Sequence, residues 1–168
     1  MIVGNGDIAS VLKDRKDRLY FASGVSNSHE KRESEYTRER NLLLRQDKKL
    51  HIVYFSTLAV FYGDNRYVQH KRQMEELIRQ EFPHYTIMRL GNITWGTNPH
   101  TIINFFRLRL KKGMPIKVQD AYRYIIDKDE FLHWIKLIPS WSAEMNITGR
   151  RMKVKEIIDE YCLIGIKT

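Results

Sequence analysis

The chain has 168 residues, enough for one domain with a hydrophobic core but not for two. Its composition, 42% hydrophobic and 29% charged, is that of a soluble globular protein, and no apolar run approaches the roughly 20 residues of a membrane-spanning helix. The single cysteine, Cys162, excludes an intramolecular disulfide and fits a reducing compartment. The N-terminus has no basic leader followed by an apolar stretch, so we expect a cytoplasmic protein without membrane insertion.

The formal net charge of +9 favours an anionic partner such as nucleic acid, an acidic membrane or a phosphorylated small molecule. The basic residues are scattered along the chain, however, and no nucleic-acid-binding motif accompanies them. We therefore expect solvated helix faces rather than a nucleic-acid interface. The six histidines and the cysteine show no metal-ligand spacing, so we expect no metal site.

Short segments rich in β-branched and aromatic residues alternate along the chain with segments of helical periodicity. Strands are expected at 1–3, 18–24, 50–57, 85–90, 122–126 and 145–148. Helices are expected at 7–15, 30–47, 66–81, 100–113, 127–138 and 154–164. This alternation predicts an α/β fold in one compact domain, residues 1–168, with a Rossmann-like parallel sheet and helices on both faces.

Ligands of such sheets bind where loops leave the carboxyl ends of the strands. Gly4 and Gly6 begin a Gly-x-Gly-x-x-Ala sequence between the first strand and the first expected helix. Glycines there let the backbone approach a pyrophosphate, and a helix N-terminus adds free N–H groups; the alternative is a tight strand–helix turn. The second strand follows at once and ends in residues 22–24, so the acidic residue expected roughly 20 positions further on is missing. We therefore expect the second and third strands of the usual fold to be missing.

Tyr67 and Lys71 lie four residues apart and would share one face of a helix. A nearby ammonium stabilises a phenolate and lowers the pKa of the tyrosine, which can then exchange a proton with a sugar hydroxyl during hydride transfer. Ser56 or Thr57, at the end of the preceding strand, could supply a further hydrogen bond. The alternative is a chance pair on a helix surface.

Later positions offer simpler alternatives. Arg89 is a candidate strand-end charge, and Asn92 either shapes its turn or contacts a ligand. Asp127 or Asp129 is expected to be the N-cap of the next helix. Arg123 could bind a substrate phosphate, because a guanidinium suits bidentate phosphate recognition.

Six segments occur in the order found in extended short-chain dehydrogenases/reductases, the NAD(P)-dependent nucleotide-sugar epimerases and dehydratases. They are "IVGNGDIA", "FASGVSNS", "VYFSTLAVFYG", "YVQHK", "MRLGNITWG" and "YRYIIDKDE". The chain resembles this family over nearly its whole length, and within it a compact subgroup associated with surface-polysaccharide biosynthesis.

The resemblance implies NAD or NADP as cofactor and a nucleotide sugar as substrate. Tyr67 would be the acid/base, Lys71 would bind the nicotinamide ribose, and Asn92 would meet the substrate. Residues implied to line the cofactor are Gly4, Gly6, Asp7, Ile8, Ala22, Ser23 and Gly24. Residues 91–168 would supply a reduced substrate side, and a homodimer is expected through helices 29–46 and 66–81.

The sequence also departs from the family pattern. Counting back from Tyr62-Gly63, the usual Ser or Thr position is Leu58, whereas counting along the strand it is Thr57. The missing strands remove the residue that selects NAD or NADP. The alternative function is a non-catalytic Rossmann-like module that binds a nucleotide or sugar nucleotide, or a subunit of a larger assembly.

Overall fold

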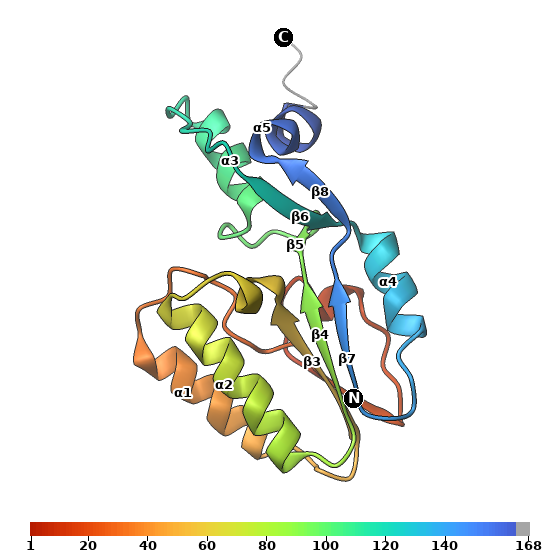
Figure 1. The fold of residues 1–168 in the computed structure, drawn as a ribbon. Coiled ribbons are helices and arrows are strands. Elements are labelled where there is room, and N and C mark those ends of the chain that lie inside the picture. The colour runs from red at the N-terminus through yellow and green to blue at the C-terminus, as the bar shows by residue number, and fades with distance from the viewer. Residues whose placement is uncertain (164–168) are drawn as a thin grey trace.

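A computed structural model of the chain describes residues 1–163. The main sheet has five parallel strands in the order β1-β2-β3-β4-β7 (Figure 1). Its strands are β1 (Ile2–Val3), β2 (Arg18–Phe21), β3 (His51–Thr57), β4 (Tyr85–Leu90) and β7 (Ala143–Ile147). A smaller sheet contains β5 (Asn92–Ile93), β6 (Tyr122–Ile126) and β8 (Arg150–Lys153), with β6 and β8 antiparallel.

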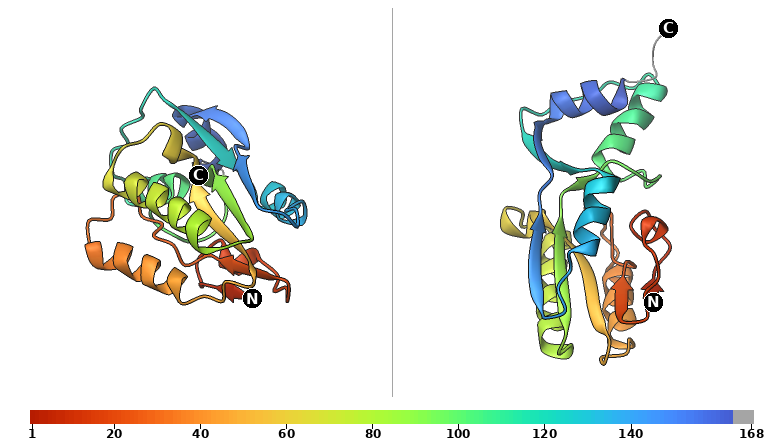
Figure 2. Two further views of the ribbon diagram at one scale, coloured as in Figure 1. Left: turned by 60° about the horizontal axis from the view of Figure 1, so that its bottom comes forward. Right: turned by 90° about the vertical axis from the view of Figure 1, so that its right-hand side faces the viewer.

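Helices cover both faces of the main sheet. The right-hand view of Figure 2 shows α4 on one face and α1 and α2 on the other. The helical elements are η1 (Ala9–Val11), α1 (Glu33–Leu44), η2 (Leu58–Phe61), α2 (Arg66–Glu81), α3 (Ile102–Lys111), α4 (Lys128–Lys136), α5 (Val154–Ile157) and a final π-helical turn, η3 (Ile158–Cys162). Asn65, Thr101 and Asp127 cap α2, α3 and α4 through their side chains, which confirms Asp127 as an N-cap.

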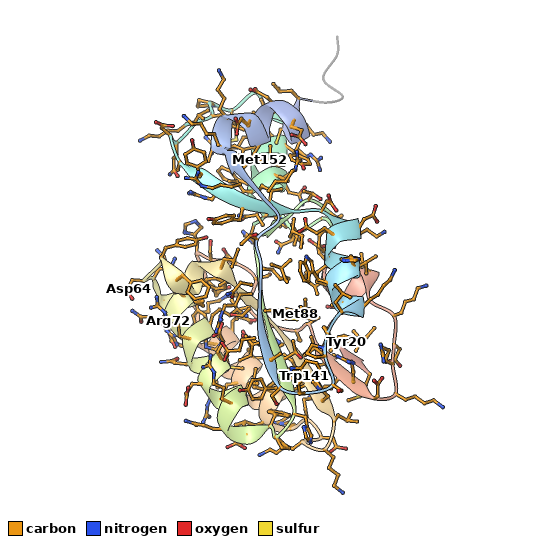
Figure 3. The ribbon with its side chains drawn as sticks, turned by 45° about the vertical axis from the view of Figure 1, so that its right-hand side comes forward. Tyr20, Asp64, Arg72, Met88, Trp141 and Met152 are labelled. Carbon is orange, nitrogen blue, oxygen red and sulfur yellow. The ribbon has the colours of Figure 1, made fainter. Side chains whose placement is uncertain are left out.

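The alternation of side chains along each strand divides the core of the main sheet into two layers. Leu19, Ile52 and Ile87 pack with Leu43 and Met74 of α1 and α2. Their strand neighbours pack on the opposite face against α4 and the η1 segment, and they include Tyr20, Val53 and Met88 (Figure 3). Burial on both faces explains why the segments that form β2, β3 and β4 are nearly continuous apolar runs.

The smaller sheet packs with α3 and α5 into a small lobe, residues 92–126 and 150–162, beyond the carboxyl ends of the main strands (Figure 1). Its core joins Ile103 and Phe106 of α3 to Met152 of β8 and Ile157 of α5.

The predicted Rossmann-like parallel sheet is confirmed, but three details of the prediction are wrong. Residues 7–15 do not form a helix beyond η1, because the chain extends at Leu12 and must return quickly to the start of β2, the direct neighbour of β1. Residues 122–126 belong to the second sheet rather than the main one. The expected helix 154–164 changes to π-helical geometry at Ile158, and its last residue, Ile164, lies outside the described residues.

Candidate functional site

A cleft of about 1760 Å³ lies between the carboxyl ends of the main strands and the small lobe. Tyr67, Lys71, Thr57, Asn92 and Arg123 all line it. The other predicted site residues along its wall are Gly6, Asp7, Ile8, Ala22, Gly24 and Ser56. The fold therefore gathers residues from six segments of the sequence into one cleft, at the edge of the sheet where ligands of such folds bind.

Tyr67 occupies the first turn of α2, which begins where the side chain of Asn65 accepts the backbone N–H of Val68. The phenol is partly buried, and burial is the largest influence on it. Burial and the charge of Glu39 raise the pKa of Tyr67 well above its ordinary value, although a hydrogen bond with Thr57 acts in the opposite direction. The expected lowering of this pKa is therefore wrong, and Tyr67 is a protonated phenol at neutral pH.

Lys71 does not offset burial and Glu39, because its ammonium is bonded to other partners. The side chain is 2% exposed, and Nζ donates to Glu39 Oε1 and to Tyr54 Oη, both at 3.0 Å. It lies 5.8 Å from the centroid of the Tyr67 ring. Lys71 thus forms a buried ion pair with Glu39. The negative charge of Glu39 largely cancels the effect of the lysine ammonium on the phenol of Tyr67.

Glu39, on the buried face of α1, is the centre of this cluster. It accepts the backbone N–H of Val25 at 2.7 Å and the hydroxyl of Tyr54 at 2.7 Å, and its second oxygen lies 2.9 Å from His70 Nε2. Burial raises the pKa of the Glu39 carboxyl, but Lys71 and the hydrogen bonds outweigh burial and hold the pKa at about 2. Glu39 is therefore a carboxylate at neutral pH.

Gly24 covers this cluster from the first part of the loop that follows β2. A Cβ at this position would lie 2.6 Å from Lys71 Nζ and 2.9 Å from Glu39 Oε1. No side chain fits there without moving the ion pair. The backbone of the loop can therefore lie directly on Lys71, at the wall of the cleft.

Ser56 and Thr57 play different parts. Ser56 donates to Glu75 Oε1 at 2.6 Å, and Glu75 in turn pairs with Arg89, so Ser56 points toward α2 and a buried ionic cluster. Thr57 caps η2 by accepting the N–H of Ala59, and its side chain acts to lower the pKa of Tyr67. Leu58 is a buried core residue. Of the candidates for the hydroxyl partner, Thr57 is the one in contact with Tyr67.

The glycine turn has a packed side and an open side. A Cβ on Gly4, whose φ is +123°, would lie 2.4 Å from the carbonyl oxygen of Ala22, so this glycine allows the close approach of β1 and β2. A Cβ on Gly6 would meet no atom within 4 Å, and Gly6 lines the cleft. Asp7 is engaged with the loop after β5: its two carboxylate oxygens accept the backbone N–H groups of Thr97 and Asn98, each at 3.0 Å.

The remaining candidates have local partners. Ser23 bonds to Arg38 through its hydroxyl and carbonyl. Asn92 donates to the carbonyl of Tyr124 at 3.1 Å and so joins β5 to β6. Arg123 donates to the carbonyl of Tyr122 and to the side chain of Gln119, at the rim of the cleft.

The sequence interpretation missed Glu39, Tyr54 and His70, which hold Lys71 in place. A signal for Glu39 was present: it lies between Tyr36 and Leu43 on the apolar stripe of its helix, where a carboxylate needs a partner. Among residues 1–163, no group of His, Cys, Asp and Glu side chains has the arrangement of a metal site. No helix in the same range has the length and apolar character needed to cross a membrane.

No protein-family model and no curated protein matches the sequence. Several solved structures are similar in fold. The Bordetella bronchiseptica enzyme WbmG in complex with NAD and UDP is 18% identical with a TM-score of 0.65, and the match covers 85% of this chain and 55% of that one. Staphylococcus aureus CapF, a capsular polysaccharide assembling protein, is 21% identical with a TM-score of 0.59, covering 92% and 46%. Bacillus anthracis dTDP-4-dehydrorhamnose reductase in complex with NADP is 17% identical with a TM-score of 0.65, covering 85% and 61%.

At these identities the likeness establishes the fold. The chain has the fold of the extended short-chain dehydrogenases/reductases, and it spans 46% to 61% of the length of these three structures.

Proposed function

We propose that the chain binds NAD or NADP in the cleft and acts in oxidation–reduction of a nucleotide-activated sugar for surface-polysaccharide biosynthesis. One observation carries the proposal: Tyr67, its partner Thr57 and Lys71 meet at the wall of the same cleft that the open backbone of Gly6 faces. An acid/base group and a place where backbone can approach a phosphate are thus on one surface.

The residues present fit the pyrophosphate and nicotinamide side of such a cofactor. Gly6 leaves room where a side chain would stand, and Lys71 retains an N–H donor beyond those given to Glu39 and Tyr54. Gly6 and the backbone near Asp7 would hold the pyrophosphate, and Lys71 would bind a ribose hydroxyl. Bound NAD(P) would supply the hydride acceptor or donor.

The protein's own groups would manage the proton. Tyr67 begins protonated, so it is ready to donate a proton to a sugar oxygen that gains negative charge, with Thr57 fixing the direction of its hydroxyl. The reverse direction requires the Tyr67 phenolate, which burial and Glu39 both disfavour. On the opposite side of the cleft, Arg109, Lys117 and Arg123 offer positive charge to a diphosphate substrate.

The proposal is tested by titrating the purified protein with NAD(H) and NADP(H), and by screening nucleotide sugars for thermal stabilisation and turnover. We expect binding of one dinucleotide. Tyr67→Phe should abolish turnover and leave dinucleotide affinity within about threefold, because only the hydroxyl is lost. Tyr85→Phe, at the far end of β4, is the matched control and should be as active as wild type. Absence of binding of either dinucleotide at millimolar concentration would overturn the proposal.

A second function is supported by the burial of Lys71 with Glu39 and by the raised pKa of Tyr67, which disfavours the phenolate. These observations favour a non-catalytic module that binds a nucleotide or sugar nucleotide, or a subunit of a larger assembly. Stabilisation by a nucleotide sugar without turnover would support it, and turnover of any nucleotide sugar would exclude it.

We also propose a homodimer through α1 and α2. A groove of about 390 Å³ runs between their outer faces, and its lining includes Tyr36, Arg40, Arg66 and Leu77. Light scattering at several protein concentrations tests this proposal; a monomer at every concentration contradicts it.

A further inference from the structure

We propose that Glu39 is a positioning residue for Lys71: its carboxylate fixes the lysine ammonium at the wall of the cleft, beneath Gly24, where the lysine can serve a bound dinucleotide. This inference rests on the proposed function. It concerns a residue on α1, whereas Tyr67 and Lys71 both come from α2.

The first support is the saturation of the Glu39 carboxylate. The side chain is fully buried, and each oxygen has two partners. Oε1 accepts from Tyr54 and Lys71, while Oε2 accepts from the backbone of Val25 and lies beside His70. A carboxylate with four fixed partners has one position only, so the lysine that pairs with it is fixed as well.

The second support is the direction in which Lys71 is held. An ammonium has three N–H donors, and the structure assigns two of them to Glu39 and Tyr54. Lys71 also lines the cleft, so its remaining donor is available to a ligand on that side. Without an anionic partner, a buried ammonium loses its proton or turns toward water. The third N–H donor of Lys71 would then no longer lie at the wall of the cleft.

The third support comes from the glycine above the pair. The backbone of Gly24 lies where only a residue without a Cβ fits over Lys71 Nζ and Glu39 Oε1. The loop after β2, which is expected to pass the ribose side of the cofactor, therefore rests directly on the ion pair. A shift of Glu39 would move both the lysine and the loop.

Glu75 provides a matched control within the same chain. It is also a buried glutamate, on α2 itself, but its partners are Ser56, Arg79 and Arg89, and it makes no hydrogen bond to Lys71. Changing Glu75 to glutamine breaks a buried ionic cluster of similar size without touching the proposed cofactor site. It therefore separates a loss of stability from a loss of positioning.

The test is a double-mutant cycle on dinucleotide affinity, measured by isothermal titration calorimetry with NAD⁺ and NADP⁺. Glu39→Gln and Lys71→Met should each weaken binding about tenfold, the usual effect of losing a charged hydrogen bond. The double variant should bind no more weakly than Lys71→Met alone, because Glu39 acts only through Lys71. Glu75→Gln should lower the melting temperature and leave the dissociation constant unchanged.

Two results would overturn the inference. One is unchanged affinity in Glu39→Gln while Lys71→Met loses affinity. The other is a double variant whose loss is the product of the two single losses, since that pattern shows independent effects. If wild type binds neither dinucleotide, the proposed function itself fails, and the wild-type titration alone shows this.

Glu39→Gln leaves a buried ammonium beside a neutral amide, so the variant is at risk of unfolding. If Glu39→Gln does not fold, Glu39→Asp is the variant that tests the inference. It keeps the charge but withdraws the carboxylate by one methylene, and Lys71 must move with it or lose its bond. We expect weakened dinucleotide binding with native circular dichroism; wild-type affinity in a folded Glu39→Asp protein would overturn the inference.

Discussion

Asp7 and Asn98 are joined at the edge of the cleft, where the carboxylate of Asp7 accepts the backbone N–H of Asn98 at 3.0 Å. The second carboxylate oxygen accepts the N–H of Thr97, and the Asp7 carbonyl accepts the indole N–H of Trp95. Gly96 lies against the same side chain, with φ of +90°, and a Cβ there would stand 2.0 Å from Asp7 Cγ. The glycine turn and the loop after β5 are thereby one clamped unit.

Asp7→Ala removes both acceptors and should release residues 94–100. We expect backbone amides of that loop to exchange with deuterium about tenfold faster, since two charge-assisted hydrogen bonds are lost at a partly exposed site. Hydrogen exchange read by mass spectrometry measures this directly. Asp64→Ala, at an exposed carboxylate whose ion-pair partner among residues 1–163 is Arg72 (Figure 3), is the control and should leave the loop unchanged. Unaltered exchange in Asp7→Ala would show that the clamp does not hold the loop.

Gly24→Ala should destabilise the fold. The added methyl group would meet Lys71 Nζ at 2.6 Å and Glu39 Oε1 at 2.9 Å, so the buried ion pair must shift or the loop must lift. We expect a loss of about 1–3 kcal/mol in the free energy of unfolding, the usual result of overpacking. Urea unfolding measures the loss. A variant as stable as wild type would mean that the ion pair has room to move.

Gly6→Ala is expected to behave in the opposite way. A Cβ at Gly6 would meet no atom within 4 Å, and its φ lies outside the left-handed region, so the melting temperature should stay within about 2 °C of wild type. The added methyl group would, however, project where the backbone is proposed to approach a pyrophosphate, so dinucleotide affinity should fall about tenfold or more. Thermal melting and a dinucleotide titration on the same sample test both halves. Undiminished affinity would place the pyrophosphate elsewhere in the cleft.

Particular elements show how far the sequence could predict the fold. The segments of β2, β3 and β4 are recognisable because burial on both faces makes them long apolar runs. β5 has two residues, and β8 is an "RRMK" segment in which Met152 is the one buried side chain. Neither segment therefore shows the alternation of apolar and polar residues that predicts a strand. Their pairing with β6 depends on contacts between distant parts of the chain, which local patterns do not encode.

The same limit applies to the site. The spacing of Tyr67 and Lys71 on one helix is local, and it was predicted. The partner that holds Lys71 is Glu39 on another helix, and their pairing depends on how α1 packs against α2. Burial, and after it the charge of Glu39, explain why the sequence motif alone gave the wrong direction for the pKa of Tyr67: the motif contains the cation, but it shows neither the burial of the phenol nor the nearby anion.

Glu39 should make the stability of the protein depend on pH in a defined window. The folded protein holds the pKa of this carboxyl at about 2, below its ordinary value of 4.5. Because the folded pKa is the lower one, the carboxylate stabilises the fold fully above pH 4.5, and this contribution is lost as pH falls toward 2. A shift of this size is worth about 3 kcal/mol.

The Glu39→Gln/Lys71→Met variant isolates this contribution from the other acidic residues, which it leaves in place. Urea unfolding of wild type and variant should therefore show a stability difference that moves in the variant's favour by about 3 kcal/mol as the pH falls from 5 toward 2. The comparison uses a difference because the free energy of unfolding of wild type alone also contains the titration of other paired carboxylates such as Glu30 and Glu160. A difference that stays constant down to pH 2 would mean that Glu39 titrates alike in the folded and unfolded chain, and that Lys71 is not its counter-ion.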